Sequence, residues 1–394
     1  MKLLLLNGHG INLKVEKAKL HVKDGFSEFG KEPTQYIYSP RRIDVDNVII
    51  YGQDGNITID AIRWLVKHGI QASFLDWNGK LLTTLLPPES TNVQTKFNQY
   101  KIYENYIERV KISKALINAK FARTKLVLDY LKPKYPEIKT DFSNEWNKIE
   151  QVKDIPEIMM IEGRVASFYW QELTKIFPEK LEFETREYQK KPRGAGDVIN
   201  CLLNYGYSIL EAECLKAINA VGLDQHVGYM HEKHSGNNSL AYDLQEPYRF
   251  LIDLAVISAI EKEVFSAKDF IRTENYNLKL RPSGAKKLLK EIETQFNNKV
   301  EFDRGMSSWH NVILIKAREL TKYFEKREID FTNPKFELKR VDSEELRQKI
   351  LAIPYHKAYE HGLHKGTLHY MKKNAKSGKI FKLYEKTLGK VREE

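Results

Sequence analysis

Apolar positions in the first 86 residues recur at the short spacing of β-strands, with turn residues between the segments. Helical spacing interrupts them once, in TIDAIRWLVKHG, which ends at a glycine. The sequence QASFLDWNGKLLTTLL predicts a hairpin, because Asn78-Gly79 separates two short strand patterns. Pro87-Pro88 closes the region. The other predicted strands lie in LLLLNGHGINLKV, KLHVK, TQYIYS and DVDNVIIYG.

From about residue 93 the apolar positions recur at helical spacing instead. The segment from KFNQYKIY to LVLDYLK keeps this spacing for about ten turns without Pro or Gly, which predicts one long helix with a buried stripe and a solvated face. YNLKLRPSG predicts a short strand or an extended link, and the stretch from KGTLHYM to the end is basic and weakly patterned. Further helices are predicted at 154–178, 197–221, 243–266, 283–297 and 309–327.

The change of period predicts an α+β fold with two parts. A small β-rich N-terminal domain covers residues 1–88, and a larger all-α domain with a basic C-terminal tail covers residues 93–394. This order argues against a doubly wound α/β fold, because its strands and helices would alternate throughout the chain.

The composition indicates the net charge of the protein and the compartment in which we expect it. The chain of 394 residues carries 64 Lys and Arg against 53 Asp and Glu, a net charge of +11 that favours a polyanionic partner. Its two cysteines, Cys201 and Cys214, are too few for a disulfide framework or a Cys-based zinc ribbon and are predicted to be buried free thiols. We find no signal peptide and no apolar run near the ~20 residues that span a bilayer, so a cytoplasmic protein without a membrane partner is expected.

Glu162 stands out in the predicted helix IPEIMMIEGRVASFYWQEL. It lies within a stripe of apolar side chains, where an unpaired carboxylate is costly to bury. Gly163 and Ala166 leave room beside it for a close approach. Two interpretations remain open: a structural ion pair, with Arg164 or with an arginine of another helix, or a place in a functional cleft.

The second polar cluster is HEKHSGNNSLAYDLQE, residues 231–246. Asp243 and Glu246 are predicted at the start of the next helix, three positions apart and therefore on one face. Capping of the helix by its acids is the better explanation for Asp243. His231 and His234 are three apart in a loop, whereas the zinc-protease motif needs four within a helix. Carboxylates with one imidazole suit Mg²⁺ or Mn²⁺, which serve phosphoryl transfer.

Basic residues gather in a third segment, where Lys190, Lys191 and Arg193 precede a predicted helix capped by Asp197. They are candidate contacts for a phosphate backbone, and so is Arg249; a solvated loop explains any one of them equally well.

Three stretches in this order and spacing carry a family resemblance: IEGRVASFYW, then INCLLNYGYSILEAECLKAINAVGLDQHVGYMH, then SLAYDLQEPYRFLID. The chain resembles, over essentially its whole length, the CRISPR-associated spacer-acquisition integrases, the first protein of the CRISPR-associated series. The resemblance implies a metal-dependent DNA endonuclease and strand transferase that inserts short foreign DNA fragments into a CRISPR array, the adaptation step of antiviral defence.

The resemblance also implies roles for single residues. Glu162, His231 and Glu246 fall on the family's catalytic metal ligands for Mg²⁺ or Mn²⁺, and Asp243 falls on an accessory acid. His234 has no counterpart in the family's pattern. The implied partners are double-stranded and branched DNA, a second copy of the chain, joined through the N-terminal domain, and a small ferredoxin-like protein, the second of the series.

A rival interpretation comes from another functional class. In it the chain is a non-catalytic, architectural DNA-binding protein whose acids and histidine only stabilise the fold. Dependence on a divalent metal separates the two, because only the enzyme loses strand transfer when a chelator is added.

Overall fold

The computed structural model describes residues 1–27, 32–52, 54–76, 78–89, 93–186, 195–231, 237–273, 277–302, 305–326 and 344–376. The chain divides into two compact units, Met1–Phe336 and Glu337–Glu394. Lys190, Lys191, Arg193 and His234 lie outside the described residues, so the predictions for them stay predictions. Among the described residues, no helix combines the length and the apolar character needed to cross a membrane.

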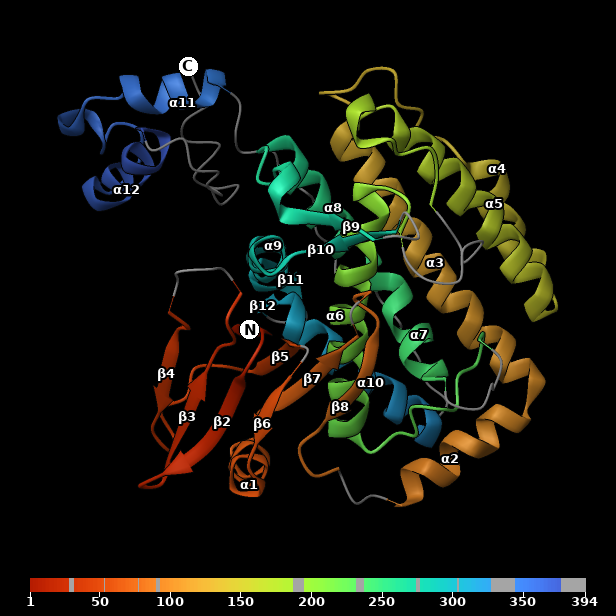
Figure 1. The fold of residues 1–394 in the computed structure, drawn as a ribbon. Coiled ribbons are helices and arrows are strands. Elements are labelled where there is room, and N and C mark those ends of the chain that lie inside the picture. Colours follow the sequence, from red (N-terminus) through yellow and green to blue (C-terminus); the bar gives the residue numbers. More distant parts are fainter. Residues whose placement is uncertain are drawn as a thin grey trace. The chain divides into compact units, whose positions relative to one another are not determined.

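The N-terminal part contains two four-stranded sheets, in the orders β1-β5-β7-β8 and β4-β3-β2-β6 (Figure 1). In the first sheet β1, β5 and β7 run parallel and β8 returns antiparallel to β7, which confirms the predicted hairpin at Asn78-Gly79. Gly79 has φ +83°, a conformation that favours glycine. The strands are β1 (Leu3–Gly8), β2 (Ile11–Glu16), β3 (Lys19–Lys23), β4 (Gln35–Tyr38), β5 (Asn47–Gly52), β6 (Gly55–Ile57), β7 (Gln71–Leu75) and β8 (Leu81–Leu85).

Helix α1 (Ile59–Lys67) lies between β6 and β7 and packs on this region's own core. Thr58 caps it by accepting the N–H of Ala61, and Trp64 and Leu65 are buried beneath it. The leucines of β1 and the apolar residues of β5 follow one another without polar residues between them, because parallel strands are buried on both faces.

Helices dominate the chain from residue 93, as predicted, and the α+β fold class is confirmed. Two short antiparallel hairpins interrupt them, β9 (Phe270–Arg272) with β10 (Leu278–Leu280), and β11 (Lys299–Phe302) with β12 (Gly305–Ser308). The helices of the first unit are α2 (Val93–Glu104), α3 (Tyr106–Leu131), α4 (Ser143–Trp146), α5 (Ile155–Thr174), α6 (Val198–Val221), α7 (Ser239–Gln245), α8 (Arg249–Glu261), α9 (Pro282–Asn297) and α10 (Trp309–Lys326). Single 3₁₀ turns lie at η1 (Asn147–Gln151), η2 (Glu179–Leu181), η3 (Glu246–Tyr248) and η4 (Ala267–Asp269).

The prediction of one long helix after residue 93 is wrong, because the helix breaks at Asn105. Asn105 leaves the helical conformation, with φ −84° and ψ 100°, and its side chain accepts the N–H of Glu108. It therefore acts as the N-cap of a new helix, α3. The break turns α3 toward α5, α7 and η3, which are its neighbours in space (Figure 1).

Helix α6 connects the first sheet to the helices. The side-chain amide of Gln71 in β7 donates to the carbonyl oxygen of Ala212, and the ring of Tyr205 packs edge-on against Tyr51 of β5. Cys201 and Cys214 of α6 are buried and unpaired, as predicted. The division into domains at residues 88–93 stays a prediction.

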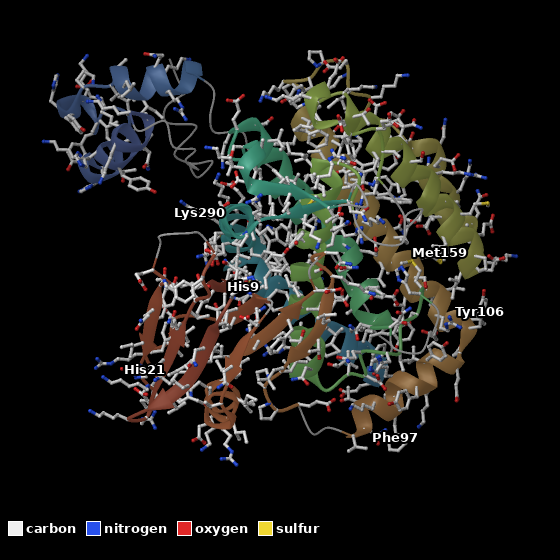
Figure 2. All side chains as sticks on the ribbon, viewed as in Figure 1. His9, His21, Phe97, Tyr106, Met159 and Lys290 are labelled. Carbon is white, nitrogen blue, oxygen red and sulfur yellow. The ribbon has the colours of Figure 1, made fainter. Side chains whose placement is uncertain are left out.

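Apolar side chains are exposed on α2, α3 and α5 at the outer edge of the helices. Figure 2 shows Phe97, Tyr106 and Met159 there, and their exposed fractions are 55%, 46% and 38%. The outer faces of these helices therefore differ from the inner faces of α3 and α5, which carry the candidate site.

The second compact unit is a small helical body that the weak pattern of the tail did not predict. It contains α11 (Glu344–Ala352), the 3₁₀ turn η5 (Tyr355–Lys357) and α12 (Lys365–Lys376). Gly362 has φ +60° at the turn before α12. Its core consists of Ile350, Ile353, Ala358, Leu363, Leu368, Met371 and Ala375.

Candidate metal-dependent active site

Glu162 lies in helix α5 within a stripe of apolar side chains, as the sequence predicts. Asp154 caps the helix by accepting the N–H of Glu157. The buried stripe includes Ile158, Ile161 and Val165 on either side of Glu162. The side chain of Glu162 is 20% exposed, and a Cβ added at Gly163 would meet no atom within 4 Å. The carboxylate thus reaches from an apolar helix face to a partially open space.

The partner of Glu162 is Lys120 of α3. The Lys120 Nζ lies 2.5 Å from Glu162 Oε1 and 2.5 Å from Glu246 Oε2. The two carboxylate oxygens are therefore no farther apart than twice this length, although 84 residues separate them along the chain. Arg164, the neighbour considered from sequence, pairs with Glu145 instead.

Glu246 begins the 3₁₀ turn η3 between α7 and α8 and is 7% exposed. Its other oxygen, Oε1, lies 3.5 Å from Arg249 Nη1. Burial raises the pKa of Glu246, but the positive charges of Lys120, Arg249 and His231 outweigh burial and lower the pKa to about 2. The carboxylate is therefore charged at neutral pH and remains a good ligand for a cation.

Asp243 does not cap a helix, so that explanation is wrong. Helix α7 already begins at Ser239, which places Asp243 in its last turns and fully buried. Asp243 Oδ2 accepts the backbone N–H groups of Tyr229 and Met230, at 2.5 and 3.0 Å, and Oδ1 accepts that of His231 at 3.1 Å. The side chain thus fixes the loop that carries His231.

A close approach of the backbone helps to hold this loop. A Cβ added at Gly228 would lie 2.7 Å from the backbone carbon of Ser239 and 2.9 Å from Asp243 Oδ2. A larger residue at position 228 would therefore push the loop away from α7.

Asp243 also orients the ring of His231, whose Nδ1 lies 2.7 Å from Asp243 Oδ1. Burial lowers the pKa of His231, but the hydrogen bond and charge of Asp243 outweigh burial, so the pKa is raised above its ordinary value. The charges of Glu246 and Lys120 also act on this pKa, in opposite directions. With Nδ1 engaged, Nε2 is the ring nitrogen that remains for a ligand.

A cavity of about 30 Å³ adjoins Glu246 and Lys120. Basic and aromatic side chains of α3, α5, α6 and α8 line it together with Glu246. Its lining consists of Lys120, Arg123, Thr124, Val165, Ala166, Tyr169, Trp170, Tyr207, Glu246, Arg249, Phe250 and Asp253. Burial lowers the pKa of Arg123 to about 10, which leaves its guanidinium charged at neutral pH.

Arg249 was predicted as a contact for DNA. The structure places it beside Glu246, which together with Glu162 forms the acid pair of the site. Its guanidinium carbon lies 3.9 Å from the ring centroid of Tyr207, in addition to the contact with Glu246. This geometry orients the guanidinium within the site. Its role in DNA binding stays a prediction.

The donor set fits a divalent cation. Glu162 and Glu246 already share one cation, the Lys120 ammonium, and the charge of Glu246 acts on the ring of His231. Oxygen ligands with one imidazole suit Mg²⁺ or Mn²⁺. In the described part of the chain no three His, Cys, Asp or Glu side chains are yet close enough to hold a metal ion. The metal would therefore need a small rearrangement of these side chains.

Sequence reasoning missed Lys120 and Arg123, although a signal for both existed. Positions three and four residues from Lys120 are buried in α3 on both sides, at Ile117 and Leu116 and at Arg123 and Thr124. A cation on a buried face needs a counter-charge, by the same argument that singled out Glu162.

Comparison with known proteins decides the family. A family model described as CRISPR associated protein Cas1 matches residues 4–294. A protein of Archaeoglobus fulgidus named CRISPR-associated endonuclease Cas1 1 is 30% identical over 340 residues, 81% of this chain and 95% of the relative. This chain belongs to the Cas1 family. The resemblance inferred from its three motifs is confirmed.

Other relatives extend this result. A Cas1 endonuclease of Francisella tularensis subsp. novicida is 29% identical over 70% of this chain and 83% of its own. A solved structure titled "Casposase bound to integration product" is 54% identical, with a TM-score of 0.86, over 90% of this chain and 100% of that chain. A Cas1 protein from Thermotoga maritima, 19% identical with a TM-score of 0.70 over 84% of this chain and 100% of that chain, shares the fold.

Proposed function

We propose that this Cas1-family chain is a divalent-metal-dependent DNA endonuclease and strand transferase. The observation that carries the proposal is the shared cation between Glu162 and Glu246, two carboxylates from distant segments in a chain of this family. In the reaction, a DNA 3′-hydroxyl attacks a phosphodiester, so one P–O bond forms while another breaks, and no ATP is needed. Water in place of the hydroxyl gives cutting at the same site.

Each residue of the site has a part in this reaction. Glu162 Oε1, Glu246 Oε2 and His231 Nε2 would hold Mg²⁺ or Mn²⁺, which would supply charge stabilisation at the phosphorus and the leaving oxygen. Asp243 holds His231 in the tautomer that presents Nε2. Arg249 stays next to Glu246, where a guanidinium can meet a phosphate oxygen.

DNA binding would come mainly from basic residues outside the acid pair. The net charge of +11 favours contacts with phosphates. Such contacts weaken as the salt concentration rises, because the release of counterions from the DNA then becomes less favourable. The predicted contacts are Lys190, Lys191, Arg193 and Arg249. Binding should therefore depend on salt, and chemistry should depend on the metal.

The test is incubation with branched DNA, with and without Mn²⁺, scored for cut strands and joined strands. The enzyme produces both products with Mn²⁺ and neither in chelator, while DNA binding persists. An architectural DNA-binding protein binds the same DNA and yields no products in either condition. Glu162→Gln provides the matched control, because it keeps the shape of the side chain and removes its charge.

The proposed function also implies two protein partners, a second copy of the chain and the second protein of the CRISPR-associated series. Two solved structures with the same fold are titled as complexes of a Cas6-RT-Cas1 protein with Cas2, although they are only 18% identical to this chain. We expect this chain to form a homodimer, joined through the N-terminal domain, and to bind the small ferredoxin-like second protein of the series when it inserts spacers. Light scattering of the chain alone and with that protein tests both contacts; a monomer at micromolar concentration contradicts the first.

A second candidate differs in the DNA that is inserted. The chain titled as a casposase is 54% identical, against 30% for the Archaeoglobus relative, which favours integration of the kind that a casposase performs. On this candidate the chain joins DNA without a second protein. On the first candidate, insertion of a short fragment into a CRISPR repeat requires the second protein. Strand transfer by the purified chain alone distinguishes them.

The C-terminal unit bears on the second candidate. Residues 337–394 lie beyond the part that matches the Cas1 family model. In this unit a segment that contains η5 and Gly362 joins α11 to α12, and α12 carries several basic residues, which are typical of a surface that contacts DNA. On α12 the residues Lys365, Thr367, His369, Tyr370, Lys373 and Lys376 are exposed. We expect this face to select the DNA that the chain integrates.

A further inference from the structure

Lys120 fills the place between the two acids of the proposed metal site. Its ammonium lies 2.5 Å from each carboxylate, and its side chain is only 16% exposed. An ammonium at this distance from both oxygens satisfies the same charge that a metal ion would satisfy. A divalent cation cannot bind both of these oxygens while the ammonium remains between them.

The charges of the site lead to the same conclusion. Glu162 and Glu246 contribute two negative charges, and Lys120 and Arg249 contribute two positive charges, so these four side chains are balanced without a metal. Adding a divalent ion without moving a cation would leave an excess of two positive charges in a partially buried space. Buried charges of one sign are strongly disfavoured.

Lys120 is the cation that can leave. Arg249 is fixed against the ring of Tyr207, at 3.9 Å, whereas lysine carries a compact charge on a flexible four-carbon stem. Its stem starts from α3, beside the cavity that adjoins Glu246. The DNA phosphate that enters with the metal offers the displaced ammonium a new anionic partner within reach of this stem.

We propose that Lys120 is an internal competitor of the metal: it holds Glu162 and Glu246 together in the metal-free protein, and the metal binds by displacing it. This rests on the proposed function, which assigns the two acids to the metal. Lys120 is on this account a positioning residue that keeps the two carboxylates together. The same exchange limits metal affinity in the absence of DNA.

The experiment measures Mn²⁺ binding to the metal-free, full-length protein at pH 7.5, by the electron paramagnetic resonance signal of free Mn²⁺. Lys120→Met removes the competing charge and keeps the length of the stem, so it should bind Mn²⁺ about tenfold more tightly, the size of effect that one close charge has on another. Lys120→Arg keeps a charge that binds carboxylates through two donors, so it should bind Mn²⁺ severalfold more weakly. Lys125→Met is the matched control, because Lys125 lies on the same helix and pairs with Asp129; its affinity should equal that of the native chain.

Thermal unfolding gives a second readout without activity. In chelator, Lys120→Met should melt below the native chain, because the two acids then repel each other, and Mn²⁺ should raise its melting temperature more than that of the native chain. A Lys120→Met protein that binds Mn²⁺ no more tightly than the native chain overturns the proposal. If that variant does not fold without metal, Lys120→Arg decides, since native or tighter affinity in it also overturns the proposal.

Glu162→Gln separates this inference from the proposed function. If the native chain and Glu162→Gln bind Mn²⁺ equally, the acid pair is not the metal site and the proposed function fails with it. If Glu162→Gln loses Mn²⁺ binding while both Lys120 variants bind as the native chain does, the metal site stands and only the competition by Lys120 is wrong.

Discussion

Glu246 and Asp253 are buried carboxylates that line the same cavity, seven positions apart along η3 and α8. Glu246 faces cations, Lys120 at 2.5 Å and Arg249 at 3.5 Å. Asp253 instead accepts hydrogen bonds from two tyrosine hydroxyls. Tyr207 of α6 donates to Oδ1 at 2.5 Å, and Tyr169 of α5 donates to Oδ2 at 2.9 Å.

The two environments shift the pKa values in opposite directions. Burial acts on both groups and favours the neutral acid. Around Glu246 the cations outweigh burial and lower its pKa to about 2. Around Asp253 burial prevails over the hydroxyl groups and the more distant Arg249 and Arg186, and the pKa of Asp253 is raised. The nature of the partners, rather than burial, thus decides the direction in which the pKa of each carboxylate shifts.

The largest expected effect is a difference in enzymatic activity between variants of Glu246 and of Asp253. Glu246→Gln should lower cutting and strand transfer about 100- to 1,000-fold, as for the loss of a group that stabilises charge in the transition state. Asp253→Asn should keep activity within about tenfold, because Asp253 connects α5, α6 and α8 and does not touch the acid pair. Strand transfer on branched DNA in Mn²⁺ measures both.

Glu162→Gln and His231→Ala should resemble Glu246→Gln in this assay, while salt-sensitive DNA binding persists in all three. His234→Ala should have a mild effect. Equal losses in Asp253→Asn and Glu246→Gln would show that both carboxylates serve the chemistry, and the distinction drawn from their partners would then be wrong.

A third buried carboxylate, Asp243, extends the comparison, because its partners are backbone N–H groups. Asp243→Ala removes the acceptor of three of them and of the His231 ring, and it should lower the free energy of unfolding by about 3 kcal/mol. Chemical denaturation in chelator measures this change. Asp243→Asn keeps one acceptor oxygen and should lose less; equal stability of the native chain and Asp243→Ala would contradict the role given to this side chain.

The sequence predicts a site best where a single residue breaks a local pattern. Glu162 interrupts an apolar stripe, so its need for a positive partner follows from helical spacing alone. Lys120 breaks a pattern in the same way but lies in a helix with many other lysines, which hides it. Asn105 also carried a local signal, an Asn followed three positions later by Glu108, which is typical of a helix start.

Contacts across a loop or between distant strands could not be predicted in this way. The bonds from Asp243 to the backbone of residues 229–231 join positions 12 to 14 residues apart, outside one helix, which no spacing encodes. The parallel pairing of β1 with β5 and of β5 with β7 joins segments that are more than twenty residues apart. Strand patterns give the strands themselves, but the order within the sheet depends on which faces the core buries.

The pH dependence of stability should show the opposite shifts directly. A lowered pKa adds stability above the unfolded pKa, near 4.5 for Glu246, and this is lost as the pH falls toward about 2. The melting temperature of the native chain minus that of Glu246→Gln should therefore decrease from pH 5 to pH 2, in chelator. A raised pKa adds stability below the unfolded pKa, near 3.8 for Asp253, which is lost as the pH rises through the folded pKa. The difference from Asp253→Asn should therefore decrease as the pH rises, and parallel trends for the two variants would contradict the comparison.

The smallest expected effect concerns the tyrosine hydroxyls around Asp253. Tyr169→Phe removes the donor to Asp253 Oδ2 and keeps the ring against Trp170, so it should lower the free energy of unfolding by about 1 kcal/mol. The hydroxyl stabilises the charged carboxylate, so its loss should raise the pKa of Asp253 further. The loss of stability that accompanies the ionisation of Asp253 should therefore occur at higher pH in the variant than in the native chain. Tyr51→Phe is a suitable control, because its hydroxyl binds Tyr205 and the carbonyl oxygen of Leu280, away from this carboxylate. If Tyr169→Phe shifts strand transfer as strongly as Glu246→Gln, the tyrosines belong to the reacting site, and Asp253 is not only a structural connection between helices.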